Sequence, residues 1–218
     1  MLNKLKVQDI RNEFIRLKAE NEISDNGTYE IINATFIADE RAIFGKVNEA
    51  YIQRELIWYL SKERNISAIP SPVPDIWTQI SGHDGSLNSN YGWCILSEEN
   101  NYQYINCLLR LAEDKTSRQA IMIYTRPEIH NDFCKNGMSD FICTNTVQLL
   151  IRDNKLIYIV SMRSNDAVFG YKNDKPWHDY VFDKALTELL PIYPDLEKGV
   201  MFWNASSLHV YPRHFNLI

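Results

Sequence analysis

The chain has 218 residues, of which 45% are hydrophobic and 23% are charged, and its formal net charge is -5. This length suits one globular domain, residues 1–218, that buries roughly 70% of the surface of its unfolded state. The acidic balance excludes a broad basic surface for a nucleic acid polymer, but a few local cations still allow a small anionic ligand. No apolar run approaches the roughly 20 residues of a membrane span, and the charged N-terminal segment does not resemble a signal peptide.

The cysteines and histidines show no metal-ligand spacing. Four cysteines form neither a CxxC pair nor a Cys/His cluster, and we expect them to be reduced thiols in a cytoplasmic protein. The five histidines are equally scattered, so no metal site is predicted.

The first half of the chain is predicted to contain helices, one strand and one irregular segment. An amphipathic helix is expected at residues 5–20, with Ile10, Phe14 and Leu17 on its apolar side. The elements expected next are a strand at 29–38, a helix at 46–63, a Pro-rich loop at 69–77 that continues irregularly through Gly92, and a helix at 100–114 carrying Ile105, Leu108 and Leu109.

The second half is richer in strands. We expect strands at 118–125, 141–152 and 155–163, a helix at 176–190 with Val181, Leu186 and Leu189 inward, and short strands at 200–205 and 207–213. Asp153-Asn154 suits a two-residue hairpin turn, which sets Arg152 opposite Lys155 and hence Cys143 near Ser164. Strands that pair by hairpin beside helices indicate an α+β fold with a mixed sheet.

Glu55 interrupts an apolar stripe on the helix expected at 46–63. Its neighbours one turn away are Tyr51, Ile52, Trp58 and Tyr59. If the carboxyl is buried, its raised pKa makes it a usable proton-transfer group. A rim glutamate whose stem packs while its head reaches water is the alternative, and periodicity alone does not decide between them.

Three further positions are ambiguous from the residues alone. Cys143 is either a thiolate nucleophile activated by neighbouring Arg163 or a small buried hydrophobe. Asp174 either caps the helix after Pro176 or lies in a site. His209 and Tyr211 alternate on one strand and so share a face, which is either functional or a half-buried sheet surface.

These positions fall in the order of a known family. The matching segments run from residue 54 almost to the end of the chain: RELIWYL (54–60), DIW (75–77), NYGW (90–93), SRQ (117–119), ICTNTVQ (142–148), RSNDAVFGYKND (163–174) and SLHVYPRH (207–214). In the same order, they resemble seven segments of thymidylate synthases. The first five carry the catalytic glutamate, the folate-contacting tryptophan, the active-site tyrosine, the phosphate-binding residues and the nucleophile. The last two are the Arg-Ser-x-Asp-x-x-x-Gly block and the His-x-Tyr strand. The stretches GMSDFICTNTVQ, IMIYTRP, MRSND and SLHVYPRHF are more similar to the bacteriophage deoxycytidylate hydroxymethylase branch.

This resemblance implies an enzyme of the thymidylate synthase fold, with sheets packed together in a homodimer. It implies transfer of a one-carbon unit from 5,10-methylenetetrahydrofolate to C5 of dCMP with addition of water, giving 5-hydroxymethyl-dCMP for modified phage DNA in the cytoplasm of an infected cell. The implied catalytic residues are Cys143, Glu55, Tyr91 and Asp174. The implied nucleotide-binding residues are Arg118, donated across the dimer, with Arg163, Ser164, Asn165, Asp174, His209 and Tyr211, and the folate-binding residues are Trp77, Asp166 and Gly170.

The chain departs from the family pattern at four places. Gln119 replaces the second phosphate arginine, and the loop Asp25–Thr28 lacks the basic residue that the family has there. Asn173 stands where synthases place a phenylalanine against folate, and the printed chain stops at Ile218, before the family's C-terminal tail. The alternatives are therefore a thymidylate synthase, a dCMP or dUMP C5-methylase, or a catalytically weak paralogue acting as a structural partner in a nucleotide-synthesis complex.

Overall fold

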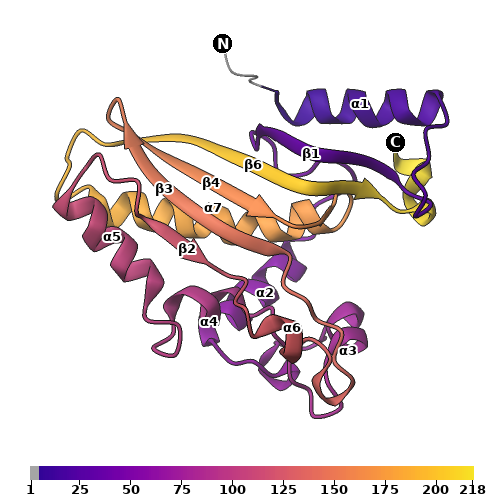
Figure 1. Ribbon diagram of the computed structural model, residues 1–218, viewed down its shortest axis with the longest axis horizontal. Coiled ribbons are helices and arrows are strands. Elements are labelled where there is room, and N and C mark those ends of the chain that lie inside the picture. The colour runs from indigo at the N-terminus through magenta and orange to yellow at the C-terminus, as the bar shows by residue number, and fades with distance from the viewer. Residues whose placement is uncertain (1–4) are drawn as a thin grey trace.

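In the computed structural model, which describes residues 5–218, six strands form one mixed sheet (Figure 1). The strands are β1 (Tyr29–Ile37), β2 (Ile121–Ile123), β3 (Thr144–Arg152), β4 (Lys155–Met162), β5 (Asn165–Asp166) and β6 (Glu197–Val210). Their order across the sheet is β1-β6-β4-β3-β2, and β5 pairs with the end of β6. The parallel pairing of β4 with β6 is made possible by the long helix that connects them, so hairpins do not account for the whole sheet.

Seven α-helices flank this sheet within the described residues: α1 (Val7–Ala19), α2 (Glu49–Ser61), α3 (Asp75–Ile80), α4 (Tyr91–Leu96), α5 (Gln103–Glu113), α6 (Ile129–Asp132) and α7 (Gly170–Leu189). Three short 3-10 turns lie at Ile66–Ala68, Lys135–Gly137 and Pro212–Leu217. Figure 1 shows α7 running along one face of the sheet, α1 beside β1, and α2, α3, α4 and α6 gathered below the sheet edge. No helix of the described residues is long and apolar enough to span a bilayer.

The β3–β4 hairpin explains where Cys143 lies. Asp153 and Asn154 both have positive φ, and Arg152 pairs with Lys155, as predicted. A bulge between Thr144 and Thr146 then shifts the register, so the amide of Arg163 donates to the carbonyl of Cys143 at 2.9 Å. Cys143 is therefore near Ser164, as predicted, but its direct partner is Arg163, because a bulge places two residues opposite one.

The two short strands predicted near the C-terminus are one continuous strand, β6. The polar pair Ser206-Ser207 interrupts the apolar pattern, but β1 pairs antiparallel with β6 on both sides of it, from Tyr29↔Val210 to Ile37↔Phe202. The continuity matters because the C-terminal end of β6 delivers His209 to the sheet edge near the helices.

Two segments predicted to be irregular are helical. Helix α3 begins directly after Pro74, where a fixed proline φ suits a helix start, and it places Trp77 inside the molecule. Helix α4 contains Gly92, whose position has no room for a side chain: a Cβ there would lie 1.8 Å from the carbonyl oxygen of Tyr59. Gly92 is therefore a contact glycine between α4 and α2, not a helix breaker.

The long helix α7 starts six residues before the predicted start at 176. Pro176 lies inside it and removes the hydrogen bond to the carbonyl of Lys172 without ending the helix, so Asp174 is within the helix and does not cap it. On α5 the apolar side is also different from the predicted one. Tyr104, Cys107 and Leu111 are buried, whereas Ile105 and Leu109 are more than half exposed.

Candidate active site

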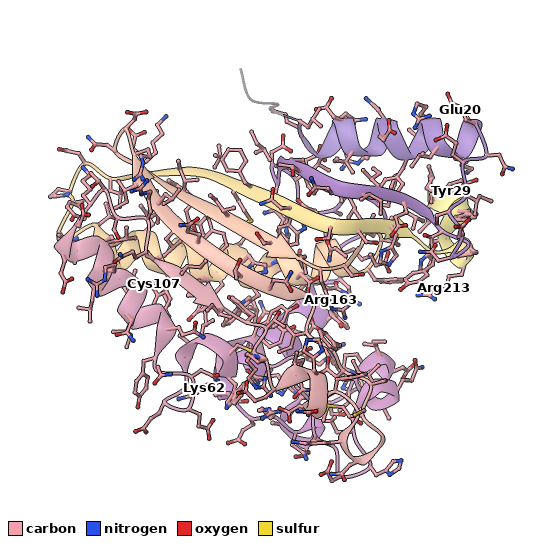
Figure 2. The ribbon with its side chains drawn as sticks, in the orientation of Figure 1. Glu20, Tyr29, Lys62, Cys107, Arg163 and Arg213 are labelled. Carbon is pink, nitrogen blue, oxygen red and sulfur yellow. The ribbon has the colours of Figure 1, made fainter. Side chains whose placement is uncertain are left out.

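A cavity of about 650 Å³ lies where the edge of the sheet meets helices α2, α3, α4 and α7. Twelve of the thirteen residues predicted from the sequence line it: Glu55, Trp77, Tyr91, Cys143, Arg163, Ser164, Asn165, Asp166, Gly170, Asp174, His209 and Tyr211. Figure 2 shows Arg163 at the junction between the sheet and the helices below it. The fold therefore gathers segments separated by more than 150 residues around one space.

Cys143 directly precedes β3 and is held against Arg163. The Arg163 guanidinium donates to the carbonyls of Ile142 at 3.0 Å and Phe141 at 2.6 Å, and its Nη2 lies 3.6 Å from the Cys143 Sγ. Burial raises the pKa of Cys143 to about 11, and the nearby Arg163 cation acts in the opposite direction. The Arg163 cation therefore offsets only part of the effect of burial, and the pKa of the Cys143 thiol stays above its usual value.

Asp140 fixes the chain just before Cys143. Its buried carboxylate accepts hydrogen bonds from the backbone amides of Asn88 and Ser89, both at 2.7 Å, and from the Ser89 hydroxyl at 2.5 Å. This joins the Cys143 segment to the loop that leads into α4 and Tyr91. Cys143 and Tyr91 are thus held relative to each other by one aspartate.

Glu55 is buried, with 3% of its surface exposed, so the rim alternative is wrong. The hydroxyl of Tyr51 donates to its Oε1 at 2.5 Å, and the indole Nε1 of Trp77 donates to the same oxygen at 2.9 Å. Burial raises the pKa of Glu55 to about 8, while these two hydrogen bonds work against that rise. A carboxyl with this pKa exchanges protons near neutral pH.

Asp174 faces the cavity from the second turn of α7. Asn165 Nδ2 donates to its Oδ2 at 2.9 Å, and the hydroxyl of Tyr91 lies 3.3 Å from its Oδ1. Burial raises the pKa of Asp174 to about 7, so this group also holds a proton near neutral pH. Tyr91 is positioned by stacking on Tyr59, with ring centroids 5.1 Å apart, at the place where Gly92 allows close approach.

His209 and Tyr211 share one face, as predicted, and both line the cavity beside Arg163. Their rings meet edge to face, with centroids 4.7 Å apart. Burial lowers the pKa of His209, so the imidazole is neutral at pH 7. A neutral imidazole and a phenol are suited to hydrogen bonding with hydroxyl groups.

The other side of the cavity carries apolar side chains. Trp77 and Gly170 are accompanied by Ile76 and Phe169, whose side chains are about half exposed, and Asn173 also faces this space. Asp166 accepts a hydrogen bond from the amide of Val168 at 2.8 Å, which fixes the turn before α7. These apolar side chains fit a flat, partly polar ring system such as a pterin.

The two positions of the Ser-Arg-Gln segment lie outside the cavity. Arg118 and Gln119 are exposed near β2, and Gln119 borders a separate surface hollow together with Gln103 and Ile121. The loop Asp25–Thr28 is closed by hydrogen bonds of its own polar side chains, with Asn26 Oδ1 accepting from Ser24 and Thr28. The structure therefore does not bring Arg118 to the site within one chain.

Several cavity residues were not identified from the sequence as site residues. Tyr51 was recognised only as a helical neighbour of Glu55, and that spacing of four was the signal for the contact. Arg213 lines the cavity near the end of the chain, stacked over Tyr211 at 4.5 Å, and Phe169 lines the apolar side. Figure 2 shows Arg213 to the right of Arg163, near the C-terminal end of β6. Within residues 5–218, no group of three or more His, Cys, Asp or Glu side chains is placed to hold a metal ion.

Comparison with known proteins agrees with this geometry. The thymidylate synthase family profile matches residues 42–218, and the chain belongs to that family. The chain is 50% identical to the deoxycytidylate 5-hydroxymethyltransferase of Enterobacteria phage T6 and 49% identical to that of Enterobacteria phage T4. Both alignments cover 97% of this chain and 89% of the relative.

Solved structures confirm the predicted fold. Thymidylate synthase A from Bacillus subtilis superposes with a TM-score of 0.72 at 22% identity, over 95% of this chain and 80% of the other. Thymidylate synthase from T4 phage gives a TM-score of 0.71 at 17% identity, over 95% and 78% of the two chains. At these identities the similarity establishes the fold, and the chemistry is inferred from the cavity.

Proposed function

We propose that this chain transfers a one-carbon unit to C5 of dCMP and adds water, giving 5-hydroxymethyl-dCMP. The observation that carries the proposal is Asp174, a carboxyl with a pKa of about 7 that faces the same cavity as Cys143. A protonated carboxyl donates to N3 of cytosine and accepts from its N4 amino group, whereas uracil presents the reverse pattern. The phage relatives that share half of its residues carry the name of the same activity.

The first step makes C5 nucleophilic. The thiol of Cys143 first gives its proton to solvent, and the thiolate, stabilised by Arg163, bonds through Sγ to C6 of the ring. Asp174 gives its proton to N3, so the electron pair that the sulfur brings is held as a neutral enamine whose reactive carbon is C5. The C5 atom then bonds to the one-carbon unit that 5,10-methylenetetrahydrofolate supplies when bound.

In the second step C5 loses its proton, the one-carbon unit separates from folate, and water is added. The C5 proton leaves by way of Tyr91 and ordered water, the bond between the one-carbon unit and folate nitrogen breaks, and an exocyclic methylene remains on C5. A water oxygen bonds to this methylene while Glu55 accepts a water proton. The C6–S bond then breaks, Cys143 leaves as the thiolate that entered the reaction, and N3 returns its proton to Asp174. The proton from C5 and the water proton passed on by Glu55 balance the two protons that the nitrogens of released tetrahydrofolate take up.

The remaining residues bind and orient the substrates. Arg163 and Ser164 hold the phosphate by charge-assisted hydrogen bonds, Asn165 holds the base-reading carboxyl of Asp174, and His209 and Tyr211 bind the ribose hydroxyl. Trp77, Asp166 and Gly170 line the folate side. We place the enzyme in the cytoplasm of a phage-infected cell, because its named relatives are phage proteins.

The phosphate site is completed by a homodimer. Arg118 is exposed and lies outside its own cavity, which is expected if it reaches the site of the partner. Sedimentation is expected to show a dimer at micromolar concentration, and mixing Arg118→Ala chains with Cys143→Ala chains is expected to restore activity above that of either variant. A fully active monomer excludes this arrangement.

Mass spectrometry of the product tests the reaction itself. With dCMP and methylenetetrahydrofolate, a gain of CH2O by the nucleotide shows hydroxymethylation, and a gain of CH2 shows methylation. Replacing dCMP by dUMP in the same assay tests the thymidylate synthase alternative. If both substrates bind but neither product forms, the result favours a structural paralogue.

A further inference from the structure

We propose that Tyr51 is a positioning residue that holds one oxygen of Glu55 and thereby presents the other, Oε2, to the reacting water. This inference rests on the proposed function, because it concerns the water-addition step. Tyr51 lies one helical turn before Glu55 on α2 and lines the same cavity. It is a residue for which neither the sequence nor the family resemblance supplied a role.

Both hydrogen bonds to the Glu55 carboxyl group reach the same oxygen. Oε1 accepts from both Tyr51 Oη, at 2.5 Å, and Trp77 Nε1, at 2.9 Å. Among residues 5–218 no donor reaches Oε2, and this oxygen is not one of the buried polar atoms cut off from solvent. Oε2 is therefore the oxygen that is open to the cavity and available to take a water proton.

Both donors are themselves fixed. The side chain of Asn48 accepts from the backbone amide of Tyr51 at 3.1 Å, which caps α2 and anchors the turn that carries the tyrosine. Trp77 packs edge to face on buried Trp58, with ring centroids 4.9 Å apart. A carboxylate held by two rigid donors through one oxygen cannot rotate freely about its terminal torsion.

The same contact sets the charge of Glu55. A hydrogen bond to a carboxylate stabilises the ionised form, so the Tyr51 hydroxyl acts against the burial that raises the pKa of Glu55. Removing the hydroxyl frees the torsion and raises the pKa further. The first change misplaces Oε2 and the second lowers the fraction of Glu55 that is ionised near neutral pH, and neither change touches bond formation by Cys143.

Tyr51→Phe tests this inference, because it removes one oxygen and keeps the ring. In a single turnover, with enzyme in excess over labelled dCMP, we expect release of tritium from C5 to stay within about twofold of the parent, since it precedes water addition. Formation of the CH2O product is expected to fall by about ten- to a hundredfold, the effect of one hydrogen bond to a charged group. With added 2-mercaptoethanol, the exocyclic methylene is expected to be trapped as a thioether in a larger share than in the parent.

The pH profile separates positioning from simple loss of stability. In the parent the yield of CH2O product relative to tritium released is expected to rise with pH through about 8, where Glu55 ionises, and in Tyr51→Phe this rise is expected to move to higher pH. Tyr193→Phe is the matched control: it also removes a tyrosine hydrogen bond, of 2.8 Å to the carbonyl of Leu111, but far from the cavity. That control is expected to change thermal stability without changing product ratio or pH profile.

A second variant keeps the test valid if Tyr51→Phe folds poorly. Tyr51→Gln retains a side-chain donor one turn from Glu55 and is expected to recover part of the CH2O product. Equal product ratios and equal pH profiles in the parent and Tyr51→Phe overturn the role of Tyr51. Absence of any CH2O product from the parent overturns the proposed function, so the two failures are distinguishable.

Discussion

The two ends of the cavity are built differently. The helical end places Glu55 and Asp174 among aromatic side chains from α2, α3 and α4, where burial raises both carboxyl pKa values. The sheet end places Cys143 at the start of β3, against the exposed guanidinium of Arg163. The two carboxyls thus lie in the buried part of the cavity, and the Arg163 cation lies in the part that is open to solvent.

This difference explains why the site tolerates two acids near one nucleotide. Desolvation is the main cause of the raised pKa of both carboxyls and keeps them partly protonated. The two acids therefore do not present two full negative charges to the pyrimidine ring. The charge of Asp174 also contributes to the raised pKa of Glu55. Substitutions at the sheet end should therefore abolish covalent chemistry, whereas those at the helical end should change which proton moves or which base is read.

The largest effect is expected at the sheet end. Cys143→Ala removes the atom that bonds to C6, and we expect tritium release from C5 to fall by at least about a thousandfold with the fold retained. Cys134→Ala, at an exposed cysteine outside the cavity, is the control and should be active. Tritium release at the parental rate from Cys143→Ala would exclude covalent catalysis by this residue.

Glu55→Gln is expected to have the next largest effect. The amide cannot take a proton from water, so the CH2O product should fall by about 10²–10⁴-fold, the usual contribution of a general base. The measurement is the product ratio by mass spectrometry, with tritium release as the internal reference. An unchanged yield of CH2O product would show that another group activates the water.

Asp174→Asn sharpens the assignment of base reading to the helical end. An asparagine presents a donor and an acceptor together and suits uracil, so we expect the ratio of kcat/KM values to move toward dUMP by about ten- to a hundredfold. The helix-cap role is already excluded, because α7 begins at Gly170. Unchanged preference between dCMP and dUMP would remove Asp174 from base reading and reopen uracil as the substrate.

The same residue predicts a pH dependence. Asp174 has its pKa raised to about 7, so it is protonated below that value and loses its proton above it. Donation to cytosine N3 requires the protonated form, so kcat/KM for dCMP should decline as pH rises through about 7. In Asp174→Asn this decline should vanish, and a decline that persists at the same pH would assign it to another group.

Much of this site followed from local sequence. The hairpin was predictable because Asp153-Asn154 tolerates positive φ, and the position of Tyr51 next to Glu55 follows from helical spacing. The register of the same hairpin placed Cys143 within one position of Arg163. These features depend on neighbours in the chain or on motif order, both of which a single sequence displays.

The features that were missed depend on contacts between distant segments. The bulge that shifts Cys143 to face Arg163 leaves no trace in hydrophobic alternation. Gly92 looks like a helix breaker until the Tyr59 carbonyl is placed against it. Glu55 is likewise covered by Trp77, which belongs to α3. That helix was not predicted, because the prolines before it indicated a loop.

The smallest predicted effect concerns the cation that the sheet end lacks. Gln119 follows Arg118 on the exposed edge near β2 and lies outside the cavity of its own chain. If the homodimer carries this edge to the partner's phosphate site, Gln119→Arg adds one charge-assisted hydrogen bond and should lower the KM for dCMP by about tenfold.

The matched control is Gln103→Arg, which adds the same charge to the same surface hollow from α5. A lower KM in both variants would indicate general electrostatic attraction, and a lower KM in Gln119→Arg alone would locate position 119 at the phosphate. No change in either would place the Ser-Arg-Gln segment away from the nucleotide, and the comparison would then leave Arg163 as the principal phosphate ligand.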